Sequence, residues 1–504
     1  MSERNLDYWQ SKAAQTAIPA NAWINGKPTP ALSGKTRSCI NPATGKVLAE
    51  VAECQPEDGD LAVKIARDTF NSGVWSKLAP SERKRILVRW AELIEANLEE
   101  IAILETLDAG KPISDTTGID VPSAVNTIRW TAEAIDKVYG EIAPTAPGTL
   151  ALIERLPLGV VLAIVPWNFP LSTTAWKLAP SLAAGNSVIL KPDPKTPLTA
   201  LKLAELATEA GLPDGVLNVL PGDGLPLGQH LSLHPDIDGQ TFTGSTAVGK
   251  LLMQYSGQSN LKRTFLELGG KSANIVFADA DLDKAAMWAA VAGFYNCGQT
   301  CTAGTRLLVQ DSIYDAFLEK VAEYAKGWQP GNPLDPNSSM GAVIDQRQID
   351  TIQKYVAIGK EEGAELLFGG EAINGLGDAG LGNELAGCYH QPTLFKGAHN
   401  DMTIAQEEIF GPVVSAIPFT DADDAIRIAN DSKYGLAGGV WSQNINTALK
   451  VANGVRTGTM GVNNYFGGDI TVPFGGFGES GNGRDKSLHA LDDYTELKTT
   501  WIEY

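Results

Sequence analysis

Residues 160–190 read VVLAIVPWNFPLSTTAWKLAPSLAAGNSVIL, and their apolar pattern indicates the class of fold. Residues 160–165 and 187–190 are short apolar runs typical of buried strands. Between them, residues 174–184 carry apolar side chains at helical spacing. Strands that are apolar along their whole length belong inside a parallel sheet, because helices cover both of its faces. The stretch therefore predicts a strand–helix–strand unit.

The same alternation continues along the chain. Residues 216–220 and 241–242 are further short apolar strands, and residues 197–210 have helical spacing. A second series has expected strands at 274–277, 307–309, 413–418 and 458–463, and expected helices at 283–296, 313–327, 346–362 and 421–430. The pattern predicts an α/β protein with two doubly wound, parallel-sheet domains that meet near residues 269–270. The cleft between them is the expected ligand site.

Several segments lie outside the two series. Residues up to about 40 are expected to form an extended arm with a hairpin-like turn at 23–27, and helical spacing covers residues 60–70, 81–108 and 121–138. Residues 140–156 and 494–504 are strand-like but have no neighbour in either series. Such strands need a partner, which either an oligomer interface or another part of the chain supplies.

Composition excludes several function classes. A chain of 504 residues predicts two or three domains, and its net charge of −19 disfavours nucleic acid and anionic membranes as partners. The five cysteines are scattered and odd in number, so we expect no disulfide framework and a reducing compartment. The first fifteen residues are unlike a signal peptide, and the apolar run at 160–166 is far too short to span a membrane. We expect a cytoplasmic protein and assign no metal site.

Cys301 lies in an unusual setting for a cysteine. Residues 296–304 read Asn-Cys-Gly-Gln-Thr-Cys-Thr-Ala-Gly, which is small and polar, whereas core cysteines normally lie among aliphatic residues. An exposed thiol near backbone N–H groups is readily held as thiolate, the form that attacks carbon. The stretch favours a catalytic nucleophile at Cys301, with a structural or incidental cysteine as the alternative.

Two glycine patterns fall short of known nucleotide-binding motifs. Residues 244–250 resemble a phosphate loop, but Leu251 replaces the hydroxyl residue that holds Mg²⁺. Residues 222–228 have one residue too many for the common dinucleotide fingerprint. Residues 243–245 nevertheless follow a predicted strand and precede a predicted helix, so their N–H groups are placed to face an anion such as a pyrophosphate. A tight turn without a ligand is the alternative.

Six sequence blocks, in order and over almost the whole chain, resemble the NAD(P)-dependent aldehyde dehydrogenase superfamily. They are PWNFP at 166–170, FTGST at 242–246, LELGGK at 266–271, the Cys301 stretch, EEIFGP at 407–412 and PFGG at 473–476. Two longer blocks, residues 131–144 and 468–502, are similar to the γ-glutamyl-γ-aminobutyraldehyde and guanidinobutyraldehyde dehydrogenases of amine catabolism.

The resemblance implies an architecture for the whole chain. It implies two Rossmann-like domains and a small β flap. The flap would join copies of the chain into a homo-oligomer, either a dimer or a tetramer. The expected NAD(P)-binding domain is 1–139 with 157–269, the expected catalytic domain is 270–480, and the expected oligomerisation segments are 140–156 and 486–504.

The resemblance also implies a covalent route from aldehyde to acid. Cys301 would attack the aldehyde carbon to give a thiohemiacetal, and its backbone N–H and the Asn168 amide would bind the oxyanion. Glu267 would activate the water that hydrolyses the later thioester, and its apolar surroundings would raise its pKa toward neutrality. Lys177 and Asp485 match a proton relay to this base, although the family usually has Glu at the second position. A solvated ion pair is the alternative for both.

The cofactor implied is NAD. Lys191 matches a ribose contact, Ser245 a pyrophosphate contact and Glu408 a nicotinamide-ribose contact, with Phe410 packed nearby and Trp167 along the same groove. The other implied contacts are Ile164, Val165, Pro166, Gly224, Gly228, Phe242, Thr243, Gly244, Glu267 and Leu268.

Pro194 departs from the family pattern. Many NAD-preferring members have Glu here, three residues after the ribose-contacting lysine, where it accepts from the 2′-hydroxyl. Its loss removes repulsion against a 2′-phosphate, so we predict a weaker preference for NAD and use of NADP as well. Asp193 is a candidate to replace part of the lost contact.

Cys297 also departs from the pattern, since the family commonly has Gln four residues before the nucleophile. A bridge between Cys297 and Cys301 under oxidation requires suitable loop geometry. Incidental packing is the favoured interpretation.

The predicted substrate tunnel has aromatic walls and an acidic end. The loop at 464–471 contains Gly467, Gly468 and Asp469 near a position where aliphatic-aldehyde members carry an aromatic residue, which predicts a wider pocket. Asp120 or Asp469 would meet an amine or guanidinium. The walls are expected to be Phe169, Trp176, Tyr295, Thr302 and Phe474. Ordinary core aromatics and a solvent-facing Asp469 are the alternative.

The favoured function is oxidation of an amine-derived aldehyde, such as γ-glutamyl-γ-aminobutyraldehyde or an aminoaldehyde of polyamine catabolism. A general aliphatic or semialdehyde dehydrogenase is the nearest alternative. A non-catalytic relative would be expected to lose Cys301, Asn168 or Glu267, and all three are present. In a third alternative, coenzyme A resolves the thioester, whereas Glu267 favours water.

Overall fold

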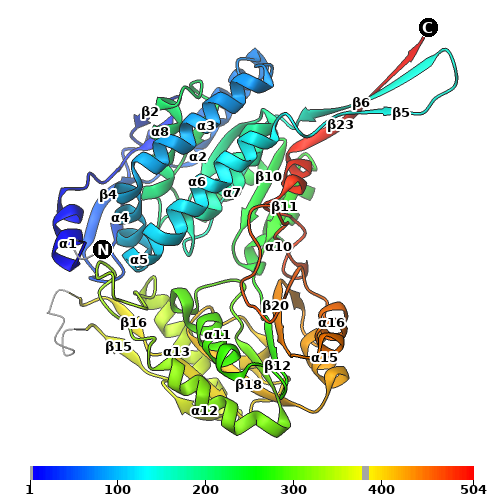
Figure 1. The fold of residues 1–504 in the computed structure, drawn as a ribbon. Helices are drawn as coiled ribbons and strands as arrows, with labels where there is room; N and C mark the ends of the chain where they lie inside the picture. The colour runs from blue at the N-terminus through cyan, green and yellow to red at the C-terminus, as the bar shows by residue number, and fades with distance from the viewer. Residues whose placement is uncertain (1–3, 377–384) are drawn as a thin grey trace.

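The first body of the fold is built on a mainly parallel, seven-stranded sheet (Figure 1). The computed structural model describes residues 4–376 and 385–504. The sheet has the order β11-β10-β7-β8-β9-β1-β2. Strands β7 and β8 are buried along their whole length, as expected for the centre of such a sheet. The parallel strands are β7 (Val160–Ile164), β8 (Ser187–Lys191), β9 (Leu217–Val219), β10 (Gly239–Thr243) and β11 (Arg263–Glu267).

Helices cover this sheet. They include α2 (Pro56–Ser72), α3 (Pro80–Ala96), α4 (Leu98–Ala109), α6 (Val121–Ala134), α7 (Pro170–Ala184), α8 (Leu198–Glu209) and α10 (Thr246–Gln258). The predicted continuous helix over 81–108 is wrong in one respect, because it breaks at Asn97. The Asn97 side-chain amide donates to the Leu93 carbonyl at 2.8 Å and so ends α3.

The amino-terminal segment is a helix and two hairpins. The extended arm predicted for residues 1–40 is partly wrong, because Leu6–Gln15 forms α1, with the Asn5 side chain accepting from the Tyr8 N–H. The first three residues of that prediction lie outside the described residues. The turn predicted at 23–27 is confirmed by the pairing of β1 (Ala22–Ile24) with β2 (Lys27–Thr29). The second hairpin pairs β3 (Thr36–Ile40) with β4 (Val47–Ala52).

The second body contains another seven-stranded sheet, of order β14-β17-β18-β13-β12-β20-β21. The sequence patterns missed β20 because of Gly438 and Gly439. A Cβ at these positions would lie 2.9 Å from the Met460 sulfur and 2.7 Å from the Tyr465 ring, so close packing requires glycine here. The strands are β12 (Ala273–Val276), β13 (Arg306–Gln310), β14 (Glu365–Phe368), β17 (Thr393–Lys396), β18 (Val413–Phe419), β20 (Ala437–Trp441) and β21 (Thr459–Val462). Its main helices are α11 (Leu282–Phe294), α12 (Tyr314–Ala325), α13 (Gln346–Glu361), α15 (Ala422–Asn430) and α16 (Ile445–Gly454).

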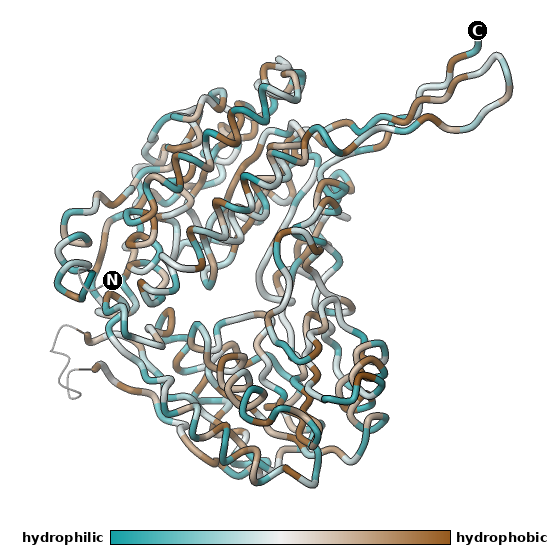
Figure 2. The backbone as a smooth tube through the Cα atoms, in the orientation of Figure 1, coloured by the Kyte–Doolittle hydropathy of each residue, from teal (hydrophilic) through white to brown (hydrophobic). Residues whose placement is uncertain are grey.

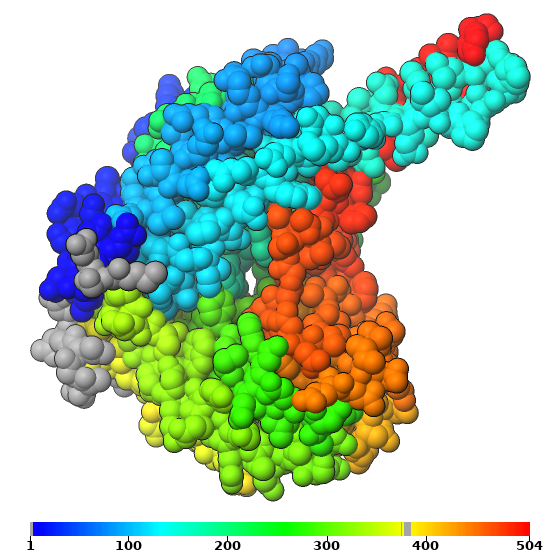
Figure 3. Space-filling view, viewed as in Figure 1, coloured from blue at the N-terminus to red at the C-terminus, as the bar shows by residue number. Residues whose placement is uncertain are grey.

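A three-stranded arm projects from the first body (Figures 1 and 3). It has the order β23-β6-β5, and β6 (Thr149–Pro157) pairs with β23 (Thr495–Glu503) in one antiparallel register. The third strand is β5 (Glu141–Ala143). The two unassigned segments of the sequence therefore pair with each other within the chain. Figure 2 shows apolar residues along this arm, away from both bodies.

The predicted fold class is confirmed, since two doubly wound sheets and a small β arm are present. Among the helices that the structure describes, none has the length and apolar character needed to cross a bilayer. The chain passes from the first sheet to the second between Glu267, at the end of β11, and Ala273, at the start of β12.

Candidate active site

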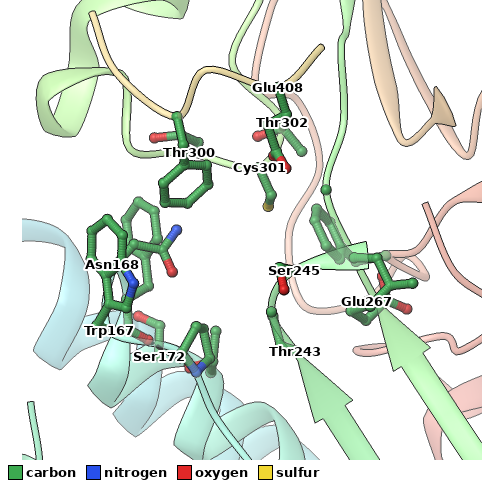
Figure 4. A pocket seen from close by; sticks show the side chains of 18 of the residues that line it. Trp167, Asn168, Ser172, Thr243, Ser245, Glu267, Thr300, Cys301, Thr302 and Glu408 are labelled. Carbon is green, nitrogen blue, oxygen red and sulfur yellow. Dashed lines mark hydrogen bonds between the residues drawn. The ribbon is translucent and has the colours of Figure 1, made fainter. Parts of the chain in front are cut away.

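Cys301 lies at a cavity of about 500 Å³ that residues from both bodies line (Figure 4). The chain reaches it from α11 through Asn296, Cys297 and Gly298, which have φ values of 50°, 56° and 67°. A Cβ at Gly298 would lie 2.2 Å from the Gly411 carbonyl oxygen, so only glycine fits this turn. The turn presents Cys301 to the cavity.

Most of the predicted site residues gather around this cavity. From the cofactor prediction these are Pro166, Trp167, Thr243, Gly244, Ser245, Glu267, Leu268, Glu408 and Phe410. From the catalytic and substrate predictions they are Asn168, Cys301, Asp485, Asp120, Phe169, Trp176, Tyr295, Thr302 and Phe474.

Other predicted cofactor contacts do not line the cavity. Ile164, Val165 and Phe242 are buried in the core. Lys191 is also buried, at the end of β8, and a Cβ at Gly228 would lie 3.4 Å from the Lys191 Cε. Gly224 and Gly228 are the first and last residues of the helical segment that follows β9.

Asp469 does not lie where the substrate prediction required. It is exposed, and its carboxylate accepts from the backbone N–H and the hydroxyl of Thr471 at 2.8 and 2.6 Å. It is not among the residues that line the cavity. The prediction that Asp469 meets the substrate is therefore wrong, because the turn uses this carboxylate locally.

The thiol of Cys301 is less exposed than predicted. Burial, followed by the carboxyl groups of Glu408 and Glu267, raises the pKa of Cys301 to about 12. In the protein without ligands, these surroundings favour the thiol form of Cys301. Deprotonation of Cys301 requires a base.

Cys297 has a separate location. Its side chain is buried in the core of the second body, and its Sγ lies 3.4 Å from the Gly341 carbonyl oxygen. Cys301 instead lines the cavity, and both thiols are free. The geometry favours incidental packing over a bridge.

Asn168 is tied to the cysteine loop by two hydrogen bonds. Its side-chain amide donates to the Gln299 carbonyl at 2.8 Å, and the Asn296 amide donates to the Asn168 carbonyl at 3.0 Å. A side-chain amide carries two N–H groups, so one remains to donate to an oxygen in the cavity.

Glu267 lies on the opposite side of Cys301 from Asn168 in Figure 4. It ends β11, is buried, and neither carboxyl oxygen has a hydrogen-bond partner among the described residues. A Cβ at Gly475 would lie 2.7 Å from its Oε1, so glycine makes room for this carboxyl group. Burial and the nearby charge of Asp485 raise the pKa of Glu267 well above its usual value.

Lys177 and Asp485 form a buried ion pair of 2.7 Å. Their side chains are 1% and 4% exposed, so the solvated-pair alternative is wrong. Lys177 comes from α7, whereas Asp485 lies in an antiparallel backbone bridge with Phe474. Both charges act on Glu267, in opposite directions.

The cofactor side of the cavity has features that fit a dinucleotide. Ser245 is the N-cap of α10, a helix of 13 residues that follows β10, so N–H groups at its start suit a pyrophosphate. The Thr243 hydroxyl is buried with no partner among the described residues. Glu408 accepts from the Gly270 N–H at 3.1 Å, and burial raises its pKa to about 7. Trp167 and Phe410 meet edge to face at 5.2 Å between ring centroids.

Aromatic pairs line the substrate side. Phe169 stacks on Tyr295 at 6.2 Å, and Trp176 contacts Phe474 at 5.2 Å. Phe466 also lines the cavity and meets Tyr295 at 6.2 Å. The loop at 464–471 thus supplies an aromatic ring that the sequence interpretation missed, although it had identified this loop as one where relatives carry one.

A buried ion pair lies at the same end. Asp120 lines the cavity, and its Oδ2 is 2.6 Å from the Lys111 Nζ, with both side chains at most 1% exposed. The Lys111 ammonium also lies 3.9 Å from the Phe169 ring centroid. Sequence reasoning missed Lys111, since a lysine nine residues from Asp120 gives no signal of the contact.

The comparisons agree with this geometry. The family model described as "Aldehyde dehydrogenase family" matches residues 29–500. NADP/NAD-dependent aldehyde dehydrogenase PuuC of Escherichia coli is 51% identical over 503 residues, covering 100% of this chain and 99% of PuuC. The crystal structure of γ-glutamyl-γ-aminobutyraldehyde dehydrogenase from Burkholderia cenocepacia has a TM-score of 0.96 and 54% identity, over 99% of each chain.

A structure of the indole-3-acetaldehyde dehydrogenase AldA of P. syringae, solved with NAD⁺, also has a TM-score of 0.96. It is 53% identical and covers 99% of this chain and 100% of its own. The matched length, the six sequence blocks and the cavity around Cys301 have one common explanation. The chain belongs to the aldehyde dehydrogenase family.

Proposed function

We propose that this aldehyde dehydrogenase oxidises an amine-derived aldehyde to the carboxylic acid through a covalent bond to Cys301. The observation that carries the proposal is the arrangement around the Cys301 sulfur, with an amide donor, Asn168, on one side and a buried carboxyl group, Glu267, on the other (Figure 4). This arrangement supplies a nucleophile, an oxyanion donor and a base within one cavity.

The first step is attack of the Cys301 sulfur on the carbonyl carbon, with loss of the thiol proton to the carboxylate of Glu408, which also lines the cavity and whose charge acts on Cys301. The carbonyl oxygen becomes an oxyanion, which accepts from the free N–H of the Asn168 amide and from the Cys301 backbone N–H. Asn168 needs no rearrangement for this task, because its other N–H is held by Gln299. A preorganised donor of this kind typically contributes about 100-fold in rate.

A bound nicotinamide cofactor would supply the hydride acceptor for the carbon attached to Cys301, whose oxidation would give a thioester on the sulfur. Ser245, Thr243 and Gly244 would hold the cofactor's pyrophosphate, Lys191 and Glu408 its two riboses, and Trp167 and Phe410 the walls of its groove. We propose NAD as the cofactor, with NADP also accepted.

Glu267 acts in the second half of the reaction. In its ionised form it takes a proton from water, which attacks the thioester carbon and releases the acid and the Cys301 thiol. Its raised pKa makes it a stronger base once ionised, and Lys177 with Asp485 sets how readily it ionises. Water rather than coenzyme A is therefore the proposed acceptor.

The proposed substrate carries a positive charge at the end remote from the aldehyde. Asp120 lines the cavity beside Lys111, and the charges of this pair act on the carboxyl groups of Asp115 and Glu105. Burial raises the pKa of Asp115 to about 6 and that of Glu105 to about 8. At pH 7, therefore, Asp115 is mostly ionised and adds negative charge beside the Lys111–Asp120 ion pair, which favours a cation in the tunnel.

The remaining proposals concern the whole protein. Residues 1–139 with 157–269 would bind the cofactor, and residues 270–480 would carry the nucleophile.

The β5–β6–β23 arm, residues 140–156 with 486–504, would join copies into a homo-oligomer, since Leu497 and Trp501 are 60% and 62% exposed on it. All five cysteines are free, which supports a cytoplasmic location.

The test is formation of reduced cofactor with 3-aminopropanal, 4-guanidinobutanal and hexanal, with and without coenzyme A. We expect activity that does not need coenzyme A and that Cys301→Ala abolishes. Undiminished turnover by Cys301→Ala would overturn the mechanism. Faster turnover only with coenzyme A would overturn the hydrolytic step.

The charge preference has its own variants. Asp120→Asn should lower kcat/KM for the two cationic aldehydes by about tenfold, mainly through KM, and leave hexanal within threefold. Asp469→Asn is the matched control, because it removes an equal charge outside the cavity. Asp120→Asn alone leaves Lys111 buried without its partner, which would destabilise the fold. Lys111→Met/Asp120→Asn removes both charges of the pair and therefore serves as the control for this effect. Equal losses for hexanal and the cationic aldehydes would contradict the cationic substrate.

A further inference from the structure

We propose that Arg37 and Asp223 together determine how well the protein accepts NADP. In this inference, which rests on the proposed cofactor site, Arg37 is the cation that binds the 2′-phosphate, and Asp223 restrains Arg37. Neither residue belongs to the sequence blocks that identified the family.

The topology brings these two residues to the end of the cofactor sheet. Arg37 lies on β3, and its Nη2 makes ion pairs with Asp223 and, at 3.0 Å, with Glu53. Asp223 follows β9 and immediately precedes Gly224. Because β8 and β9 are parallel neighbours, residues that follow them meet at the same sheet edge.

Lys191 connects this pair to the adenosine end of the site. It is the last residue of β8, it is buried, and its Nζ donates to the Pro192 carbonyl at 3.1 Å. A Cβ at Gly228 would lie 3.4 Å from the Lys191 Cε and 3.7 Å from the Asp223 carbonyl oxygen, so Lys191 and Asp223 lie beside the same glycine. The charges of Asp193, Asp223 and Arg37 also act on the Lys191 ammonium. The Arg37–Asp223 pair is therefore within electrostatic reach of the lysine proposed to contact the ribose.

The balance of charge explains the two roles. Arg37 and Lys191 are opposed by three carboxylates, Glu53, Asp223 and Asp193, so the group has a net charge of about −1. Position 194 is proline and adds no carboxylate. Loss of Asp223 removes one negative charge and so favours a phosphate, whereas loss of Arg37 leaves more negative charge, which repels it.

Arg37 is suited to move between partners. Its side chain is 39% exposed, and its Nε has no hydrogen-bond partner among the described residues. A guanidinium binds phosphate through two parallel N–H groups, a stronger arrangement than its monodentate contacts with Asp223 and Glu53. The 2′-phosphate can therefore compete for Arg37, and a 2′-hydroxyl cannot.

The test measures binding without turnover, by titration calorimetry with adenosine 2′,5′-bisphosphate and with 5′-AMP. Arg37→Gln should weaken adenosine 2′,5′-bisphosphate at least tenfold and change 5′-AMP far less. Asp223→Asn should tighten adenosine 2′,5′-bisphosphate at least threefold. Both effects should shrink as salt increases, because the groups are partly exposed.

Lys35→Gln is the matched control. Lys35 is exposed two residues before Arg37 and forms no ion pair among the described residues, so it tests the effect of charge alone. Retained binding of 5′-AMP verifies that each variant folds. The inference would be overturned if Arg37→Gln and Lys35→Gln lost equal affinity for adenosine 2′,5′-bisphosphate. It would also be overturned if Asp223→Asn did not bind adenosine 2′,5′-bisphosphate more tightly. Aldehyde oxidation by the wild-type protein with NAD tests the proposed function separately.

Discussion

The Nζ of Lys177 lies 2.7 Å from the Oδ2 of Asp485, and this buried pair acts on the carboxyl group of Glu267. Burial is the largest cause of the raised pKa of Glu267, and the negative charge of Asp485 is the second largest. The positive charge of Lys177 lowers this pKa. The pair therefore adjusts the proposed base rather than forming an isolated surface contact.

Asp485→Asn should move the pH dependence of turnover to lower pH. Glu267 is active when ionised, and removal of a nearby negative charge lowers its pKa, so activity should rise at a lower pH than in the wild type. The measurement is kcat against pH, with Asp469→Asn as a control for the removal of an exposed carboxylate. The variant should also lose about 3 kcal/mol of stability, because Lys177 remains buried without its partner. A shift of the profile to higher pH would contradict this account.

Alkylation of Cys301 by iodoacetamide should accelerate steeply with pH in the protein without cofactor. Only the thiolate reacts, and burial with two nearby carboxyl groups raises the pKa of Cys301 to about 12. The rate should increase about tenfold per pH unit between about pH 7 and 10. Peptide mass spectrometry assigns the site, and Cys301→Ala removes the signal. A rate that is already constant at pH 8 would mean that the resting form is a thiolate.

Trp501→Asp should weaken assembly. Trp501 is 62% exposed on β23, where it pairs with Ala151 of β6, so the substitution leaves the core of either body intact. Light scattering coupled to size-exclusion chromatography should show a smaller species than the wild type at the same concentration. Lys498→Asp, a charge change on the same strand without loss of apolar area, is the control. An unchanged mass for Trp501→Asp would remove the arm from the proposed interface.

Local patterns predicted the strands that are apolar along their whole length. Strands β7 and β8 agree with the predicted runs within one residue, because their burial on both faces leaves a clear signal. Patterns failed at β20, where Gly438 and Gly439 are required by close packing, and at α1, whose Asn5 cap was overlooked. Both failures arise where contacts with distant residues, or one polar cap, outweigh apolar periodicity.

The candidate site depended on the family resemblance more than on periodicity. The motif blocks indicated Cys301, Asn168 and Glu267, which line one cavity, but motifs contain no information about neighbouring charges. The Arg37–Asp223 pair joins segments that are far apart in sequence, and the Lys111–Asp120 pair spans nine residues without a local pattern that marks it. Asp469 was misassigned for a different reason, because its carboxylate is used in a local turn with Thr471.

The most direct test of the covalent route is mass spectrometry of Glu267→Gln after mixing with aldehyde and NAD. Without the base, the thioester should form and persist, so a peptide containing Cys301 should gain the mass of the acyl group while steady-state turnover falls by at least 100-fold. Cys301→Ala/Glu267→Gln should show no such adduct. The account would be contradicted if Glu267→Gln turned over normally, or if it released one equivalent of reduced cofactor and left Cys301 unmodified.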